Sequence, residues 1–141
     1  MPRRVEIAAH VLVPAPASRV WDLVTDWDRQ QDWMPGTRVS GGHGAGAELV
    51  ARTEIGPVGF RDTMEITEWD PPRRCVMKHT GHLLRGEGLF EVSQAGEVSQ
   101  FSWTERLQLP FAVPLPLLWW LLLPAARWGM AAALRRLARL L

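Results

Sequence analysis

Residues 109–141, LPFAVPLPLLWWLLLPAARWGMAAALRRLARLL, decide the fold, because no other segment of the chain is as long and as apolar. From Met130 onward apolar residues recur at three- and four-residue spacing while the arginines fall largely between them. This spacing predicts an amphipathic helix with one solvated face. Residues 117–123 are apolar on every side, so a helix there must be covered by protein, by a bound apolar molecule or by lipid. We expect a helix from about Pro116 onward, packed across the concave, apolar face of a sheet.

Lipid is the first alternative for this covering. Residues 110–126 form a run of 17 without a charge, at the short end of the range for a membrane-spanning helix. The run contains Pro110, Pro114, Pro116 and Pro124, and prolines inside a helix remove backbone donors. This argues against a span and favours two successive helical pieces opened by Pro116 and Pro124. An apolar stretch rich in tryptophan and followed by arginines is also typical of an interfacial segment, so peripheral membrane contact through residues 110–126 stays an alternative.

Length and composition set the broad class of protein. A chain of 141 residues is long enough for one domain with its own core, and we expect a single domain over residues 1–141. One cysteine excludes an internal disulfide, and the first ten residues lack the apolar run of a signal peptide, so we expect a cytoplasmic location. The formal charge of +1 provides no basic field for nucleic acid. The sequence leaves the oligomeric state open.

The residues before this stretch predict one strand, two short helices and six further strands. Residues 4–13 alternate loosely and read as a strand, a first helix begins near Ser18 or at Pro16, and a second helix covers residues 27–34. Strands joined by glycine and proline turns are expected at residues 37–42, 47–55, 58–69, 74–80, 82–92 and 98–109. This order predicts an α+β fold in which a curved, seven-stranded antiparallel sheet wraps the long C-terminal helix.

The turns between the strands predict which side chains share a face of the sheet. A tip at residues 56–57 places Asp62 opposite Ala51, a tip at residues 80–81 places His79 opposite His82, and a turn at residues 94–97 places Phe90 opposite Phe101. In the last register Gly86 and Gly88 lie opposite Glu105 and Trp103, which suggests a pocket or a bend. The candidate ligand-binding residues are the apolar members of this dry face together with part of the C-terminal helix: Phe60, Met64, Met77, Leu84, Phe90, Phe101, Trp103, Leu118, Trp119 and Leu122.

Four ionisable residues interrupt the predicted dry face: Asp62, His79, His82 and Glu105. Such groups are costly to bury without a partner or a task. The registers place Asp62 one diagonal step from His79, within reach of a hydrogen bond that sets the imidazole tautomer. We therefore name His79 as a candidate general base, with Asp62 and Glu105 as further catalytic candidates. The spacing C-x3-H-x2-H at Cys75, His79 and His82 argues little for a metal, because four residues of strand span about 13 Å.

The segment VLVPAPASRVWDLVTDWDRQQDWMPG at residues 11–36 resembles the opening of the START-like superfamily, also called SRPBCC. These helix-grip proteins include polyketide cyclases, lipid-transfer domains and plant allergens. The segments WDPPRRCVM and FSWTERLQLP are similar to later strands of the family, and ALRRLARLL is similar to its terminal helix. The resemblance covers the whole chain. It implies a helix-grip fold with a cavity for an apolar small molecule between sheet and C-terminal helix, and it implies no cofactor and no single catalytic motif.

Three interpretations of that cavity remain open. The first is binding or transfer of a lipid, quinone or polyketide-like molecule. The second is a polyketide cyclase or aromatase whose inward acid and base act on a folded substrate. The third is a membrane-associated interaction module. Chemistry in the cavity separates the first two, since a cyclase needs an inward residue with a shifted pKa.

Overall fold

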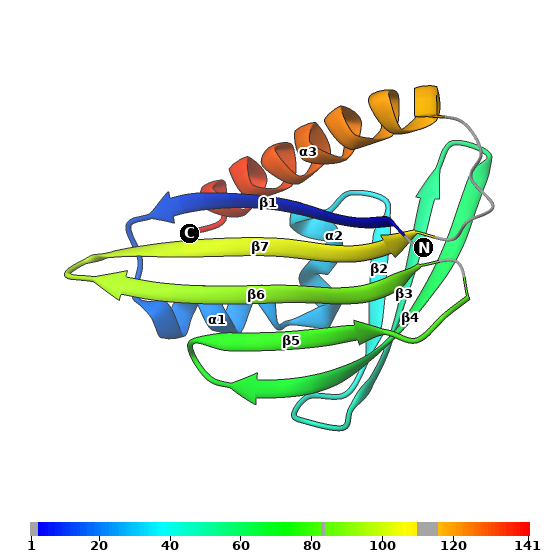
Figure 1. Ribbon diagram of the computed structural model, residues 1–141. Coiled ribbons are helices and arrows are strands. Elements are labelled where there is room, and N and C mark those ends of the chain that lie inside the picture. Colours follow the sequence, from blue (N-terminus) through cyan, green and yellow to red (C-terminus); the bar gives the residue numbers. More distant parts are fainter. Residues whose placement is uncertain (1–2, 83, 110–115) are drawn as a thin grey trace.

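The computed structural model describes the backbone of residues 3–82, 84–109 and 116–141, and the side chains of residues 4–54, 56–82, 84–108 and 122–141. Within these residues the chain forms one seven-stranded antiparallel sheet, three α-helices and one 3-10 turn (Figure 1). In chain order the elements are β1 (Arg3–Val13), α1 (Ala17–Val24), η1 (Trp27–Arg29), α2 (Gln30–Trp33), β2 (Thr37–Gly41), β3 (Glu48–Ile55), β4 (Val58–Asp70), β5 (Arg74–His79), β6 (Arg85–Ala95), β7 (Val98–Leu109) and α3 (Pro116–Arg139).

The architecture confirms the predicted α+β class and helix-grip order. The strand order is β1-β7-β6-β5-β4-β3-β2, so the first and last strands of the chain are neighbours. The sheet curves, and α1 and α2 lie against its inner face (Figure 1). The helix α1 begins at Ala17 with Pro16 as its N-cap residue, and no side chain caps it, so the alternative cap at Ser18 is wrong. Pro16 fits this position because its φ of −67° is compatible with the entry into a helix.

The strand registers are partly those that the turns predict. Between β3 and β4 the pairs are as expected, including Ala51 opposite Asp62. Between β5 and β6 the connection is longer than predicted, and His79 pairs with Gly86 instead of His82. Between β6 and β7, Phe90 pairs with Trp103 instead of Phe101. The observed pairing therefore differs from the predicted one by four residues between β5 and β6 and by two residues between β6 and β7. Because side chains alternate with a period of two, even shifts leave the predicted inner face unchanged.

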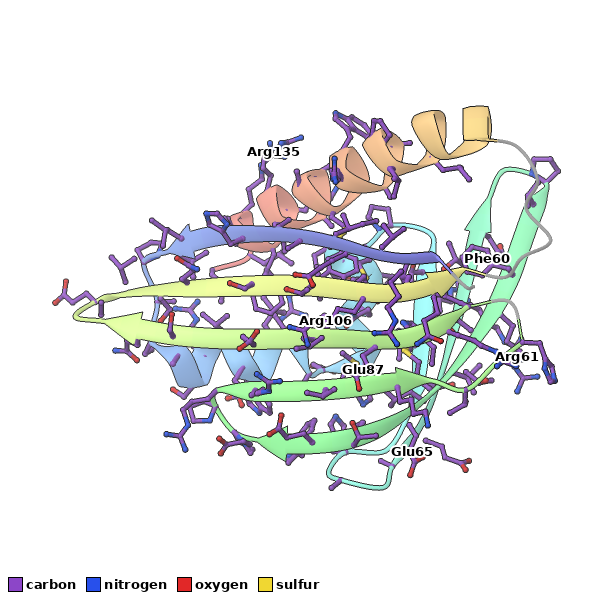
Figure 2. The ribbon with its side chains drawn as sticks, viewed as in Figure 1. Phe60, Arg61, Glu65, Glu87, Arg106 and Arg135 are labelled. Carbon is purple, nitrogen blue, oxygen red and sulfur yellow. The ribbon has the colours of Figure 1, made fainter. Side chains whose placement is uncertain are left out.

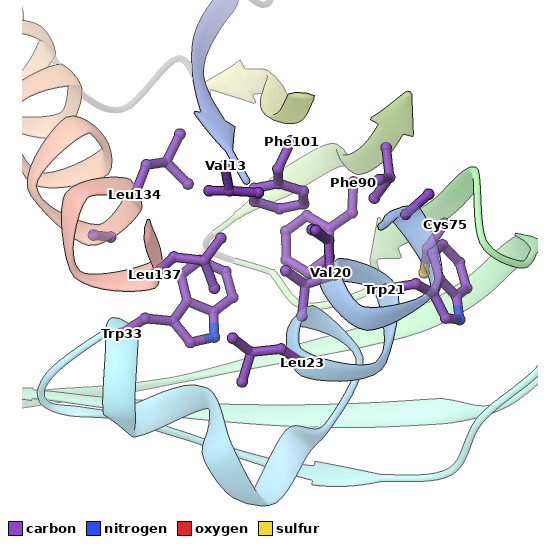
Figure 3. Packing of buried hydrophobic residues seen from close by; sticks show 14 of the residues in the cluster. Val13, Val20, Trp21, Leu23, Trp33, Cys75, Phe90, Phe101, Leu134 and Leu137 are labelled. Atoms are coloured by element: carbon purple, nitrogen blue, oxygen red, sulfur yellow. The ribbon is translucent and has the colours of Figure 1, made fainter. Parts of the chain in front are cut away.

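The closed core lies where α1, α2 and the C-terminal half of α3 meet the sheet (Figure 3). Trp33 is fully buried there, and its ring centroid lies 6.0 Å from those of Phe90, Phe101 and Trp103. Leu134 and Leu137 of α3 pack into the same cluster. Phe101 and Trp103 meet this indole edge to face and Phe90 is tilted against it, so the three rings bury a large apolar area in favourable geometry. This cluster therefore anchors α3 to the sheet through its last turns.

The helix α3 begins at Pro116, as the sequence predicts, but its described residues are not packed over their whole length. Met130, Leu134 and Leu137 are buried, whereas residues 124–129 are all exposed. The helix packs on β1 and α2, and its N-terminal end is raised away from β1 (Figure 1). The expectation that α3 packs across the concave face therefore holds only for the C-terminal half. The predicted orientations of Trp119 and Trp120 concern side chains outside the described residues.

Candidate functional site

Three ionisable residues from three strands meet on the inner face of the sheet. His79 lies at the end of β5, and Met64 of β4 pairs with it, so Asp62 is one diagonal step away. Glu105 lies on β7, two strands from β5, and β6 passes between them with Gly86 opposite His79 and Gly88 opposite Glu105. Strands two apart are separated by about 9.6 Å. The two glycines have no side chains, so the imidazole and the carboxylate can meet over β6.

The contacts within this cluster, which we call the Asp62–His79–Glu105 triad, are short and use both nitrogens of the imidazole. His79 Nδ1 lies 2.9 Å from Asp62 Oδ2, and His79 Nε2 lies 3.0 Å from Glu105 Oε2. The indole of Trp103 donates to the second oxygen, Glu105 Oε1, at 2.9 Å. The His79 side chain is only 2% exposed, while those of Asp62 and Glu105 are 11% and 19% exposed. The carboxylates therefore form the solvent-facing side of the triad.

Two opposing effects determine the pKa of His79. Burial of the ring disfavours the charged imidazolium and lowers the pKa, whereas the hydrogen bonds to Asp62 and Glu105 and their negative charges raise it. The carboxylates prevail, and the pKa of His79 is raised from 6.5 to about 9. At neutral pH the ring is thus an imidazolium that donates one N–H to each carboxylate. This charge distribution does not fit the expectation that His79 is a general base, because the ring is already protonated.

The groups of the triad that can still accept a proton or a hydrogen bond are the two carboxylates. One buried positive charge between two carboxylates gives the triad a net charge of −1. Removing three charged groups from water is costly, and a buried ion pair often contributes little net stability. A partly exposed cluster of interacting charges with a perturbed pKa is also typical of a site of recognition or proton transfer.

The eight predicted lining residues whose side chains are described fall into three groups. Met64, Leu84 and Trp103 are half-buried on the inner face or at its end, and Met64 and Trp103 directly adjoin triad residues by strand pairing or hydrogen bond. Met77, Phe90 and Phe101 are buried in the closed core, where they pack with other side chains. Phe60 and Leu122 are 51% and 47% exposed. The side chains of Leu118 and Trp119 are outside the described residues.

His82 lies in the β5–β6 connection and is exposed, so the prediction that it lies on the inner face is wrong. The tip expected at residues 80–81 resembles a tight turn, but the next strand begins only at Arg85. Gly86 has a φ of +120°, and an added Cβ would overlap the carbonyl oxygen of Arg106. Only glycine fits this close approach of β6 to β7.

The described residues contain no group of three His, Cys, Asp or Glu side chains suited to a metal ion.

Sequence reasoning missed the contribution of β1 to this region. Pairing of β1 with β7 places Ile7 opposite Glu105 and Ala9 opposite Trp103 on the inner face. Ile7 is buried and Ala9 is half-buried. The alternation of residues 4–13 was the available signal, but the partner strand of β1 is nearly 100 residues away in the sequence, as the register shows.

A recess of about 910 Å³ is open to solvent, and His79 of the triad is among its lining residues, whereas Asp62 and Glu105 are not. Among its lining residues, Glu6, Arg106, Glu87 and Lys78 form one row across β1, β7, β6 and β5. Figure 2 shows Arg106 and Glu87 on the outer face of the sheet, and the alternation of side chains places the rest of the row there too. The recess therefore extends from this charged row to His79 at the end of β5, and its lining does not include the two carboxylates of the triad.

Solved structures confirm the fold. TTHA0849 from Thermus thermophilus matches with a TM-score of 0.81 and 21% identity, over 96% of this chain and 95% of that one. Mll3558 from Rhizobium loti matches with a TM-score of 0.79 and 17% identity, over 100% and 99% of the two chains. DynU16, from the dynemicin biosynthetic locus, matches with a TM-score of 0.70 and 20% identity, over 95% of this chain and 46% of that one. At such identities the likeness is one of fold alone.

No curated protein matches the sequence. Among the described residues, no helix is long and apolar enough to span a membrane. A family model described as polyketide cyclase / dehydrase and lipid transport matches residues 4–141. This match and the helix-grip fold agree with the resemblance seen in the sequence. Because the match covers nearly the whole length, the chain belongs to the polyketide cyclase/dehydrase and lipid transport family.

Proposed function

We propose that this protein binds a hydrophobic small molecule of lipid, quinone or polyketide type that carries a hydroxyl group. The observation that supports this proposal is the Asp62–His79–Glu105 triad at the edge of a half-buried apolar surface. An apolar ligand lies on Met64 and Trp103, and its O–H donates to a carboxylate of the triad. Family membership supports a hydrophobic ligand, and the triad adds the expectation of one polar anchor.

The chemistry of the triad favours a neutral or cationic donor over an anion. The net charge of −1 repels an anionic head group. His79 donates both of its N–H groups to the carboxylates, so it has none left for an acceptor on the ligand. A hydrogen bond to a charged group contributes about 1.5–3 kcal/mol, which corresponds to at least about tenfold in affinity.

A matched pair of probes tests this anchor. Naphthalene and 1-naphthol differ by one hydroxyl, and isothermal titration calorimetry gives the affinity of each. We expect the wild type to bind 1-naphthol about tenfold more tightly than naphthalene. Of the two variants Asp62→Asn and Glu105→Gln, the one that replaces the carboxylate accepting the hydroxyl should show a smaller preference for 1-naphthol. The reason is that a neutral amide oxygen is a weaker acceptor.

The matched control is Glu65→Gln, an exposed carboxylate on the same strand as Asp62 (Figure 2). This variant should retain the full preference for 1-naphthol. Equal affinities of the wild type for the two probes would refute the anchor, and the absence of binding of either probe would refute the apolar site.

A cyclase or dehydratase is the second candidate function. The observation that favours it is that two carboxylates lie on either side of one imidazolium. One carboxylate can take a proton from a carbon atom of the substrate, while the imidazolium stays paired with the other carboxylate. Asp62 or Glu105, and not His79, is then the base. A simple ketone tests this step: the wild type should accelerate exchange of the C1 protons of 2-tetralone in D2O, measured by NMR. An exchange rate equal to that in buffer would refute the cyclase or dehydratase function and leave binding as the only proposed function.

A further inference from the structure

The middle of α3 presents an unusual surface, because its exposed residues are mostly apolar. Residues 124–129 are all exposed, and Arg127 is the one charged residue among them. Trp128 is 70% exposed and Leu122 is 47% exposed. A contiguous exposed apolar patch, unlike a single exposed apolar residue, is typical of an interaction site. This surface is independent of the triad, which lies on the inner face of the sheet.

The charges on this part of the chain are all of one sign. After Glu105 the sequence contains no acidic residue, and five arginines follow at positions 106, 127, 135, 136 and 139. Arg135, Arg136 and Arg139 are exposed. The formal charge of the whole chain is only +1, so the positive charge of α3 is a local feature. An anionic surface is its electrostatic complement.

Trp128 shares one side of the helix with two of these arginines. Positions seven and eleven residues apart return to nearly the same direction on an α-helix, which places Arg135 and Arg139 in line with Trp128. The buried residues Met130 and Leu137 lie on the opposite side. Figure 2 shows Arg135 pointing away from the sheet. The row from residue 128 to residue 139 is about 16 Å long, and it is free to meet a flat surface along its length.

We propose that this row of α3 docks the protein on an anionic lipid bilayer, with the helix lying in the plane of the interface. Indoles favour the interfacial layer, and arginines contact anionic headgroups. The bilayer is favoured over a protein partner because the charged residues of α3 are all arginines and its exposed apolar residues form a run beside them, which is typical of an interfacial helix. Docking brings the apolar molecule of the proposed function close to its source, but the docking surface does not depend on that function.

Vesicle flotation tests the proposal with the full chain. We expect the wild type to float with vesicles of 30% phosphatidylserine in phosphatidylcholine at low salt, and not with pure phosphatidylcholine. Binding should decrease in 0.5 M salt because screening weakens the attraction. Trp128→Ala should weaken binding about tenfold. Arg135→Gln and Arg139→Gln should each weaken it about fivefold, since one basic residue contributes about 1 kcal/mol near an anionic surface.

Leu12→Ala is the matched control, because Leu12 is also a large exposed apolar residue, at 62%, but lies on β1. It should leave vesicle binding unchanged. Flotation that Trp128→Ala and the arginine variants do not weaken would overturn the proposal, and so would absence of flotation with either vesicle. A wild-type dimer that Trp128→Ala converts to a monomer, without vesicle binding, would assign the row to a second copy of the chain. Binding of 1-naphthol is measured separately, so failure of the docking proposal and failure of the ligand proposal are distinguishable.

Discussion

Stability against pH provides the sharpest test of the charge state of His79. The pKa of His79 in the folded protein is about 9, against 6.5 for an unperturbed histidine. A raised pKa in the folded state means that the folded protein binds the proton more tightly. The resulting stabilisation is therefore complete below pH 6.5 and is lost as the pH rises through about 9. The difference of 2.5 units corresponds to about 3 kcal/mol in total.

Most of this change falls between pH 6 and pH 9. The linkage relation gives a decrease of about 3 kcal/mol in the free energy of unfolding over that interval. The Cys75 thiol, whose pKa burial raises to about 12, destabilises the fold only above its unfolded pKa of about 8.5–9. Measurements up to pH 9 therefore report mainly on His79.

Urea denaturation of the wild type, His79→Gln and His10→Gln at pH 6, 7, 8 and 9 isolates this contribution. His79→Gln should be less stable at pH 6, because the two carboxylates lose the charge between them, by roughly 3–5 kcal/mol. Its stability should also lose the pH dependence that the wild type shows. His10→Gln replaces an exposed histidine on β1 and should follow the wild type. Identical pH slopes for the wild type and His79→Gln would refute the assigned charge state.

Three further substitutions test the packing around the site by urea denaturation. Leu137→Ala removes a fully buried side chain of α3 and should cost about 2–5 kcal/mol; a cost below about 1 kcal/mol would mean that the helix is not anchored there. Gly86→Ala should cost at least about 2 kcal/mol, because φ is +120° and the added Cβ meets the Arg106 carbonyl, and an unchanged midpoint would contradict that close approach. Trp103→Phe keeps an aromatic ring but removes the donor to Glu105, so we expect a loss of about 1.5–3 kcal/mol, and no loss would show that the bond contributes nothing.

The sequence predicts the fold and the members of the triad because the period-two alternation is robust. The tip at Gly56 and Pro57 is a true two-residue turn, so the β3–β4 register and the position of Asp62 follow directly. At the next hairpin Thr80 and Gly81 look like a tip, but the chain continues to Arg85 before pairing resumes. The predicted β5–β6 register was wrong by four residues, an even number, so the prediction that His79 lies on the inner face was unaffected.

The charge state of His79 could not be predicted because it depends on a contact across an intervening strand. Glu105 reaches the imidazole only because β6 carries Gly86 and Gly88 between them. The predicted register placed Gly86 opposite Glu105 and Gly88 opposite Trp103, and the small residues facing large ones were interpreted as a pocket or a bend. The sequence also could not predict that the N-terminal half of α3 is raised away from β1. The apolar character of a helix indicates that it must be buried, but it does not indicate against which surface.

Native mass spectrometry of the protein purified from its own host tests the central claim most directly. The account predicts that the wild type carries an apolar molecule with at least one hydroxyl group. It also predicts that the double variant Asp62→Asn/Glu105→Gln loses this molecule, while Glu65→Gln retains it. A wild type that carries no molecule, or a double variant that retains the same molecule at the same occupancy, would contradict the proposal that the triad anchors a hydrophobic ligand.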